Sequence, residues 1–306
     1  MPTLAWCYDA PLPPVGEPEG WEHLVNDLIT LAAPEHSSQD TLSTDAAPSW
    51  IHGKFAYGLV NKDLQGERVE FWIDDCSGAY ARLGEAETDS DGKAELQVPE
   101  GALPIPGSFA VLMRVVGDQS EVRSTLSIYP VGTELIVTDV DGTLTTSDGE
   151  LFSELFDGSY VPESRDHALE LMALRAAQGY PLVYLTGRPY WLDRITRGWL
   201  VDEGYPVGTL HLAPTNGDVL PQDDGVGAYK AEWLRSLLDQ GFVLSGAYGN
   251  ASTDIYGYEN APVSKDRTWI AGELGGEGGT VAVGEDWVAH TAAAAIEPDP
   301  VQPFTR

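Results

Sequence analysis

Two aspartates, Asp139 and Asp141, directly follow a short apolar run, Leu135–Val137, near the middle of the sequence. Such a run is typical of a buried strand, and α/β proteins bind ligands at the carboxyl ends of their strands. Gly142 allows the chain to turn sharply there, and the hydroxyl of Thr143 can bond a ligand oxygen. Two carboxylates at this spacing can serve one metal ion and one reacting group.

Polar residues follow later apolar runs in the same way. They are Thr186-Gly187-Arg188, then Lys230 at the expected start of a helix, then Asn250 to Asp254. In a parallel sheet these positions converge on one crevice. Together they suit phosphoryl transfer, which needs a nucleophile, a cation for the phosphate oxygens and an acid for the leaving group.

Each group has a predicted role in that chemistry. Asp139 is the predicted nucleophile, forming an aspartyl phosphate, and Asp141 is the predicted acid and base. Thr186 and Lys230 complete the predicted catalytic set by holding phosphate oxygens. Oxygen donors suited to Mg2+ predict a metal site made of Asp139, Asp141, Asn250 and Asp254. The predicted substrate-binding residues are Gly142, Thr143, Gly187 and Arg188.

The segments around these residues alternate between strand and helix after Pro130, which predicts an α/β fold with a parallel sheet over 131–275. Strands are expected at 135–138, 181–185, 209–212, 243–248 and near 267–271, and helices at 164–178, 190–203, 228–239 and 252–260. The intervening stretches are too short for a cap domain of about 100 residues, so the site is predicted to be open. Apolar residues near its predicted rim could touch acyl chains or pack in the core: Phe152, Leu155, Phe156, Tyr160, Tyr190 and Trp191.

Residues 49–130 show short alternating runs between turn residues, which predicts a small β-sandwich of immunoglobulin-like type. Strands are expected at 54–60, 68–73, 94–98, 109–116 and 120–128. Residues 1–48 are predicted to form a proline-rich arm, an amphipathic helix over 21–33 and a linker over 34–48, and residues 276–306 a tail. The helix lacks Lys and Arg on its polar face, which favours packing on the protein over insertion into an anionic membrane.

The 306 residues include 17 basic and 48 acidic residues, a formal charge of −31 that repels nucleic acid. Only Cys7 and Cys76 are present, which fits a reducing compartment. There is no leader pattern and no apolar run of about 20 residues. We therefore expect a cytoplasmic protein, with peripheral contact to membranes left open.

The motifs together resemble the haloacid dehalogenase superfamily, and within it the lipin phosphatidate phosphatases. The resemblance rests on Asp139 to Asp148, on Thr196 to Leu200, on Leu212-Ala213-Pro214 and on Gly249 to Tyr258. It implies a Rossmann-like domain and Mg2+-dependent hydrolysis of phosphatidate to diacylglycerol and phosphate, with a phospholipid as partner.

Two alternatives remain at this stage. One keeps the mechanism and changes the substrate to a soluble or protein-bound phosphomonoester. The other is a non-catalytic module that binds phosphatidate. The presence of Asp141 and Lys230 favours an enzyme here, because a module that only binds needs no general acid.

Overall fold

The computed structural model describes residues 11–23, 26–58, 62–75, 77–147, 161–213, 223–301 and 303. The chain forms two compact units, one made mainly of residues up to Pro130 and the other mainly of residues from Val131 onward. We call them the β unit and the α/β unit, and each has a hydrophobic core of its own.

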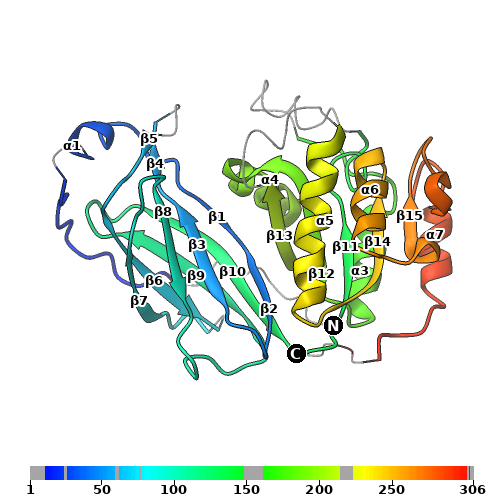
Figure 1. Cartoon of the computed structure of the whole chain (residues 1–306), viewed down its shortest axis with the longest axis horizontal. Coiled ribbons are helices and arrows are strands. Elements are labelled where there is room, and N and C mark those ends of the chain that lie inside the picture. The colour runs from blue at the N-terminus through cyan, green and yellow to red at the C-terminus, as the bar shows by residue number, and fades with distance from the viewer. Residues whose placement is uncertain are drawn as a thin grey trace. The chain divides into compact units, whose positions relative to one another are not determined.

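The β unit consists of small sheets that pack around one core (Figure 1). Its five-stranded sheet has the order β2 (Thr41–Thr44), β10 (Glu121–Tyr129), β9 (Gly107–Val115), β6 (Arg68–Asp74) and β7 (Ala81–Glu87). A three-stranded sheet contains β1 (Ser37–Gln39), β3 (Trp50–Lys54) and β8 (Lys93–Gln97), and β4 (Ala56–Tyr57) pairs with β5 (Lys62–Asp63). Alternate side chains such as Ile51, Phe71 and Met113 fill the core. The predicted β-sandwich is thus confirmed, whereas its immunoglobulin-like type stays a prediction.

The predicted linker over 34–48 is wrong, because β1 and β2 lie within it. Serine, threonine and aspartate suggested turns, but here they bond to neighbouring strands. The Ser38 hydroxyl donates to the Arg123 carbonyl at 2.8 Å, and the Asp40 carboxylate accepts from the Thr125 amide at 2.7 Å. These partly buried bonds compensate for the low strand propensity of the segment.

The helix predicted over 21–33 is also wrong in extent: the described part of this segment contains only α1 (Asn26–Ile29) as α-helix. The buried carboxylate of Glu67 accepts hydrogen bonds from the backbone amides of Glu22 and His23, both at 3.1 Å, and from the Asn26 side chain at 2.6 Å. These tertiary contacts compete with continuous helix.

The α/β unit is built on a six-stranded parallel sheet in the order β13 (Gly208–Ala213), β12 (Leu182–Pro189), β11 (Glu134–Thr138), β14 (Val243–Gly249), β15 (Thr268–Ile270) and β16 (Val281–Ala282). Helices α5 (Asp223–Asp239) and α6 (Ser252–Asn260) pack together in front of the sheet in Figure 1. Helix α3 (Ala168–Ala177) packs on β12 and on α7 (Val288–Ala294), and α4 (Asp193–Asp202) follows a short 3-10 turn, Tyr190–Leu192. The predicted parallel sheet is confirmed, and the haloacid dehalogenase type of the fold stays a prediction.

Two element boundaries differ from the expected ones in ways that concern the site. Helix α5 begins at Asp223, so Lys230 lies about two turns inside it and not at its start. Strand β12 extends to Pro189, with an irregularity after Leu185, so Thr186 and Arg188 belong to the strand. The expected rim residues Phe152, Leu155, Phe156 and Tyr160, with Asp148 and Pro214 of the resemblance, lie outside the described residues.

Candidate functional site

A buried lysine joins two of the predicted site carboxylates. The Lys230 Nζ atom lies 2.6 Å from Asp139 Oδ1 and 2.6 Å from Asp254 Oδ1. All three residues are at most 5% exposed. Lysine and acidic residues are rarely buried this deeply unless they are paired, so the pairing within this triad is what permits its burial.

The three residues reach one point from three elements. Asp139 directly follows β11, and its amide donates to the Tyr248 carbonyl of β14 at 3.0 Å. Asp254 lies in the first turn of α6, where its second oxygen accepts the amides of Asn250 at 2.9 Å and Ala251 at 3.0 Å. Lys230 comes from α5, which approaches α6 closely at Gly257: a Cβ there would lie 2.9 Å from Lys230 Cβ.

The charges in this triad do not balance when every group is ionised. Burial, aided by the negative charge of Asp254, raises the pKa of Asp139 to about 8 against the attraction of Lys230. Burial disfavours the Lys230 ammonium, but the two carboxylates outweigh it and raise the pKa of Lys230. Lys230 therefore stays cationic, and the shift of the Asp139 pKa favours the protonated form of that carboxyl.

Asp141 belongs to a second cluster and pairs with Arg188. The Arg188 Nε lies 2.9 Å from Asp141 Oδ2, and the Nη2 donates to Oδ1 at 2.8 Å. The Thr186 hydroxyl lies 3.3 Å from the same carboxylate, and Arg188 also donates to the Thr196 hydroxyl at 3.1 Å. A guanidinium bound to both oxygens of a carboxylate forms a strong, oriented ion pair. Asp141 is thus an ion-pair partner in this geometry.

The loop between these clusters is supported through its backbone. Gly142 adopts φ 71°, a conformation that favours glycine, and its amide donates to the Thr145 hydroxyl at 2.9 Å. The Thr143 hydroxyl lies 3.1 Å from Asp139 Oδ2 and 2.9 Å from Asn250 Oδ1. Thr143 therefore links β11 to the start of α6.

Two side chains that the sequence did not single out support the same loop. Arg165 donates to the carbonyls of Gly142 at 2.6 Å and Thr146 at 3.1 Å. The Trp287 indole, fully buried, donates to the Thr143 carbonyl at 2.9 Å. Contacts to a carbonyl leave no pattern in the residue types of the loop, so no sequence signal pointed to either residue.

The structure brings all ten predicted site residues to the carboxyl ends of β11, β12 and β14 or to the helices beside them. Gly187 is among them, and a Cβ at Gly187 would lie 2.9 Å from Val226 of α5. The assignment of catalytic and substrate-binding roles to these residues stays a prediction.

The predicted Mg2+ site can be compared with this geometry. Among the residues that the structure describes, no three acidic, histidine or cysteine side chains converge in an arrangement that could hold a metal ion. Instead the Lys230 ammonium lies between Asp139 and Asp254. Lys230 thus competes with a metal ion for these two carboxylates, and Mg2+ as a cofactor stays a prediction.

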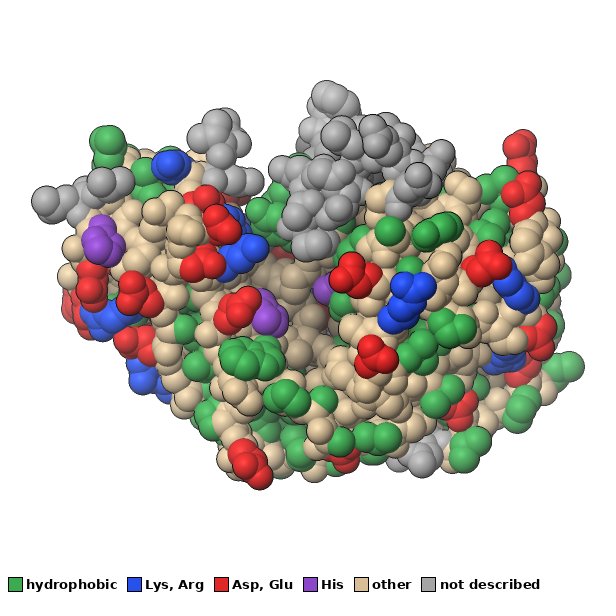
Figure 2. Space-filling model, in the orientation of Figure 1, with side chains coloured by type: hydrophobic (Ala, Val, Ile, Leu, Met, Phe, Trp, Pro, Cys, Tyr) green, Lys and Arg blue, Asp and Glu red, His purple; other side chains and the backbone are tan. Residues whose placement is uncertain are grey.

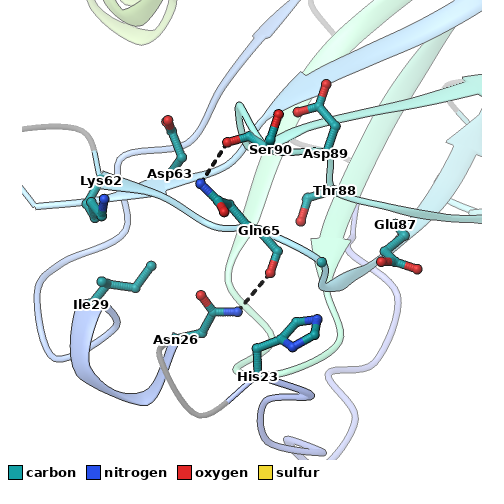
Figure 3. A pocket seen from close by; sticks show the side chains of 11 residues that line it. His23, Asn26, Ile29, Lys62, Asp63, Gln65, Glu87, Thr88, Asp89 and Ser90 are labelled. Atoms are coloured by element: carbon teal, nitrogen blue, oxygen red, sulfur yellow. Dashed lines mark hydrogen bonds between the residues drawn. The ribbon is translucent and has the colours of Figure 1, made fainter.

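The β unit has a separate cavity of about 560 Å³ beside α1, shown in Figure 3. The turns that follow β5 and β7 form its walls, and Gln65 connects them by donating to the Ser90 carbonyl at 2.7 Å. The polar groups that line it bond mainly to the protein itself, so we assign it no reaction.

The fold and the site define a two-unit protein: a β-sandwich and an α/β domain with internally paired acidic and basic side chains at the end of its parallel sheet. Residues 136–272 match the family "PITM 1-3, LNS2 domain", and residues 34–128 match "PITM 1-3, beta-sandwich domain". Each unit of the chain is therefore similar to a domain of the PITM 1-3 family.

Individual relatives agree with these family matches. Protein retinal degeneration B of Drosophila melanogaster is 27% identical over 266 residues, covering 85% of this chain and 20% of the relative. Human membrane-associated phosphatidylinositol transfer protein 3 is 28% identical, covering 84% of this chain and 26% of the relative. Human membrane-associated phosphatidylinositol transfer protein 1 is 29% identical, covering 89% of this chain and 21% of the relative. The chain thus spans only a fifth to a quarter of these relatives.

These findings correct the expected activity. The two human relatives are named as phosphatidylinositol transfer proteins, so the prediction of a Mg2+-dependent phosphatase, and the hydrolase keywords that go with it, are wrong. The match to an LNS2 domain of transfer proteins takes the place of the expected lipin phosphatase family. Expected contact with phospholipid and membrane agrees with the relatives' names. No helix in the described ranges has the length and hydrophobicity to cross a bilayer.

Proposed function

We propose that the α/β unit is a non-catalytic module that binds the phosphate group of a phosphatidate-type phospholipid at the carboxyl ends of β11, β12 and β14. The observation that carries this proposal is the buried Lys230 ammonium, which contacts one oxygen of Asp139 while the Thr143 hydroxyl contacts the other. A cation held at a fixed point with little exposure to water is a strong partner for a phosphate oxygen.

A phosphate can compete with Asp139 for this cation. The raised pKa of Asp139 means that it binds a proton more readily than an ordinary aspartate. Once protonated, Asp139 releases Lys230 to a phosphate oxygen and can itself donate a hydrogen bond. The site then exchanges one anionic partner of Lys230 for another without burying an unpaired charge.

The pairing of Asp141 supports binding without turnover. Phosphoester hydrolysis needs an acid that can reach the leaving oxygen. Here both Asp141 oxygens bond to Arg188, which is buried and also anchored on Thr196. The names of the two human relatives favour the same conclusion, although this chain spans only about a fifth to a quarter of the proteins that carry those names.

Binding of a water-soluble, short-chain phosphatidate, measured by calorimetry, tests the proposal. Asp139→Asn should bind at least as tightly as the wild type, because it frees Lys230 and removes a repelling charge. Adding Lys230→Gln to that variant restores the wild-type net charge and should weaken binding by about tenfold or more, the effect of one charge-assisted hydrogen bond. Lys265→Gln, at a surface lysine paired with Glu259, is the matched control.

Two results would contradict the proposal. Equal affinity of Asp139→Asn and the double variant would show that Lys230 does not contact the phosphate. Release of inorganic phosphate from phosphatidate by the wild type would show that the site is not merely a binding site.

A further inference from the structure

The segment from α1 to Leu31 presents two leucines to solvent. Leu28 is 73% exposed and Leu31 is 82% exposed. Leu28 lies in α1, and Leu31 lies in the turn that directly follows it. Figure 2 shows hydrophobic side chains projecting over the position of α1. Exposed apolar side chains that lie close together mark contact surfaces more often than isolated ones do.

The backbone that carries these leucines is firmly attached to the β unit. Asn26, 3% exposed, donates to the Gln65 carbonyl at 3.0 Å and to the buried Glu67 carboxylate at 2.6 Å. Beyond Leu31, the Ala33 carbonyl accepts the Gly58 amide at 2.8 Å. Ile29 packs against the core between these two points. Because the segment is attached at both ends and in its middle, Leu28 and Leu31 cannot turn inward together.

The surrounding charge restricts what these leucines can contact. The cavity directly behind α1 is lined by the carboxylates of Asp63, Glu87 and Asp89 and by one lysine, Lys62 (Figure 3). The chain as a whole carries a charge of −31. An anionic surface is therefore repelled, whereas the outward-facing ammonium groups of zwitterionic phospholipids are compatible with these carboxylates.

We infer that Leu28 and Leu31 form a membrane-contact tip of the β unit that inserts into the interfacial layer of a zwitterionic phospholipid bilayer. The inference rests on the proposed function, which requires the chain to meet its ligand at a membrane. A chain this acidic cannot gain that contact from basic side chains, so apolar insertion must supply it. The tip is a site separate from the phosphate site of the α/β unit.

Vesicles of phosphatidylcholine alone provide the test, with partition of the full chain measured by sedimentation. The double variant Leu28→Ser, Leu31→Ser should partition at least about tenfold more weakly than the wild type, because each leucine loses most of its apolar transfer energy. Ile296→Ser, at an 88% exposed side chain of the α/β unit, is the matched control and should partition like the wild type. Raising the salt concentration should change wild-type partition by less than about twofold.

A second variant gives a direct reading of insertion. Leu31→Trp should show a blue shift of its additional fluorescence when vesicles are added, and no shift would overturn the inference. Wild-type partition by the double serine variant would also overturn it and would assign the leucines to a protein partner. Binding of soluble short-chain phosphatidate by the double variant should equal that of the wild type, so a failure of the phosphate site is seen separately from a failure of the tip.

Discussion

Replacing Lys230 by glutamine removes the only cation that contacts both Asp139 and Asp254 in the described structure. Both carboxylates then stay in a buried environment, 5% and 0% exposed, without a positive partner. Breaking a buried ion pair from one side costs about 3–5 kcal/mol, because the remaining charge is left uncompensated. We expect Lys230→Gln to lower the free energy of unfolding of the α/β unit by an amount in this range.

Asp139→Asn should instead change how the stability of the α/β unit depends on pH. The folded-state pKa of Asp139, about 8, lies above the ordinary aspartate value of 3.8, so the folded state binds the proton more tightly. The contribution of this group to stability is complete below about pH 4 and is lost as the pH rises through about 8. Asp139→Asn should therefore remove part of the decline in stability between pH 5 and pH 8.

The two substitutions together form a double-mutant cycle. Urea unfolding at pH 5 and pH 8, followed by tryptophan fluorescence and compared at a constant slope, gives the four free energies. The double variant should be more stable than the sum of the single effects predicts by about 1–3 kcal/mol, since Asp139→Asn removes one of the uncompensated charges. Lys265→Gln at the surface should change stability by less than about 0.5 kcal/mol.

Additive effects would refute this account of the triad. A Lys230→Gln variant as stable as the wild type would do the same, because it would mean that water reaches the two carboxylates in spite of their burial.

Three further changes test other parts of the structure. Burial lowers the pKa of His36 to about 4 from the ordinary histidine value of 6.5, so its contribution to stability is present above about pH 6.5 and is lost toward pH 4. His36→Gln should remove up to about 3 kcal/mol of that acid sensitivity in urea titrations of the β unit, and the same substitution at the exposed His52 should not. Gly257→Ala should cost about 1–3 kcal/mol and weaken phosphatidate binding by moving Lys230, whereas Gly198→Ala in α4, where an added Cβ meets nothing within 4 Å, should be neutral or slightly stabilising. Trp287→Phe should cost about 1–3 kcal/mol in thermal or urea unfolding, since the Thr143 carbonyl loses a buried donor, and an unchanged midpoint would contradict that role.

Periodicity was a reliable guide in the α/β unit. The predicted helix 252–260 coincides with α6, and the predicted strands at 135–138 and 243–248 differ from β11 and β14 by one residue at one end. Buried strands of a parallel sheet are continuous apolar runs, so their position is visible in the residue types themselves. The same pattern predicted that Asp139 and Asp254 lie close together, since residues that follow neighbouring parallel strands meet at the carboxyl edge of the sheet.

The N-terminal part of the β unit could not be predicted in this way. Its strands β1 and β2 are polar, and their stability comes from hydrogen bonds to residues about 85 positions away, such as those from Ser38 and to Asp40. The apolar spacing of 21–33 predicted a helix, but the buried Glu67 carboxylate binds the amides of that segment instead. The secondary-structure propensity of a segment depends on its own residues and carries no information about such distant partners.

The ion pairs between the site residues could not be predicted from the sequence either. Spacing showed that Asp141 and Arg188 would lie near one another, but not that the guanidinium would bond both carboxylate oxygens. Whether a carboxylate reacts or pairs depends on distances of a few tenths of an ångström. Sequence spacing does not set such distances.

The support of the site loop by Arg165 and Trp287 affects how this site can change over generations. Both side chains contact carbonyl oxygens of residues 142–146, and every amino acid carries the same carbonyl. The shape of the loop therefore depends on few of its own side chains: the glycine at its turn and the hydroxyls of Thr143 and Thr145. Substitutions at the other loop positions can alter ligand preference while the frame persists, and the same frame is a suitable starting point for engineering new headgroup specificities.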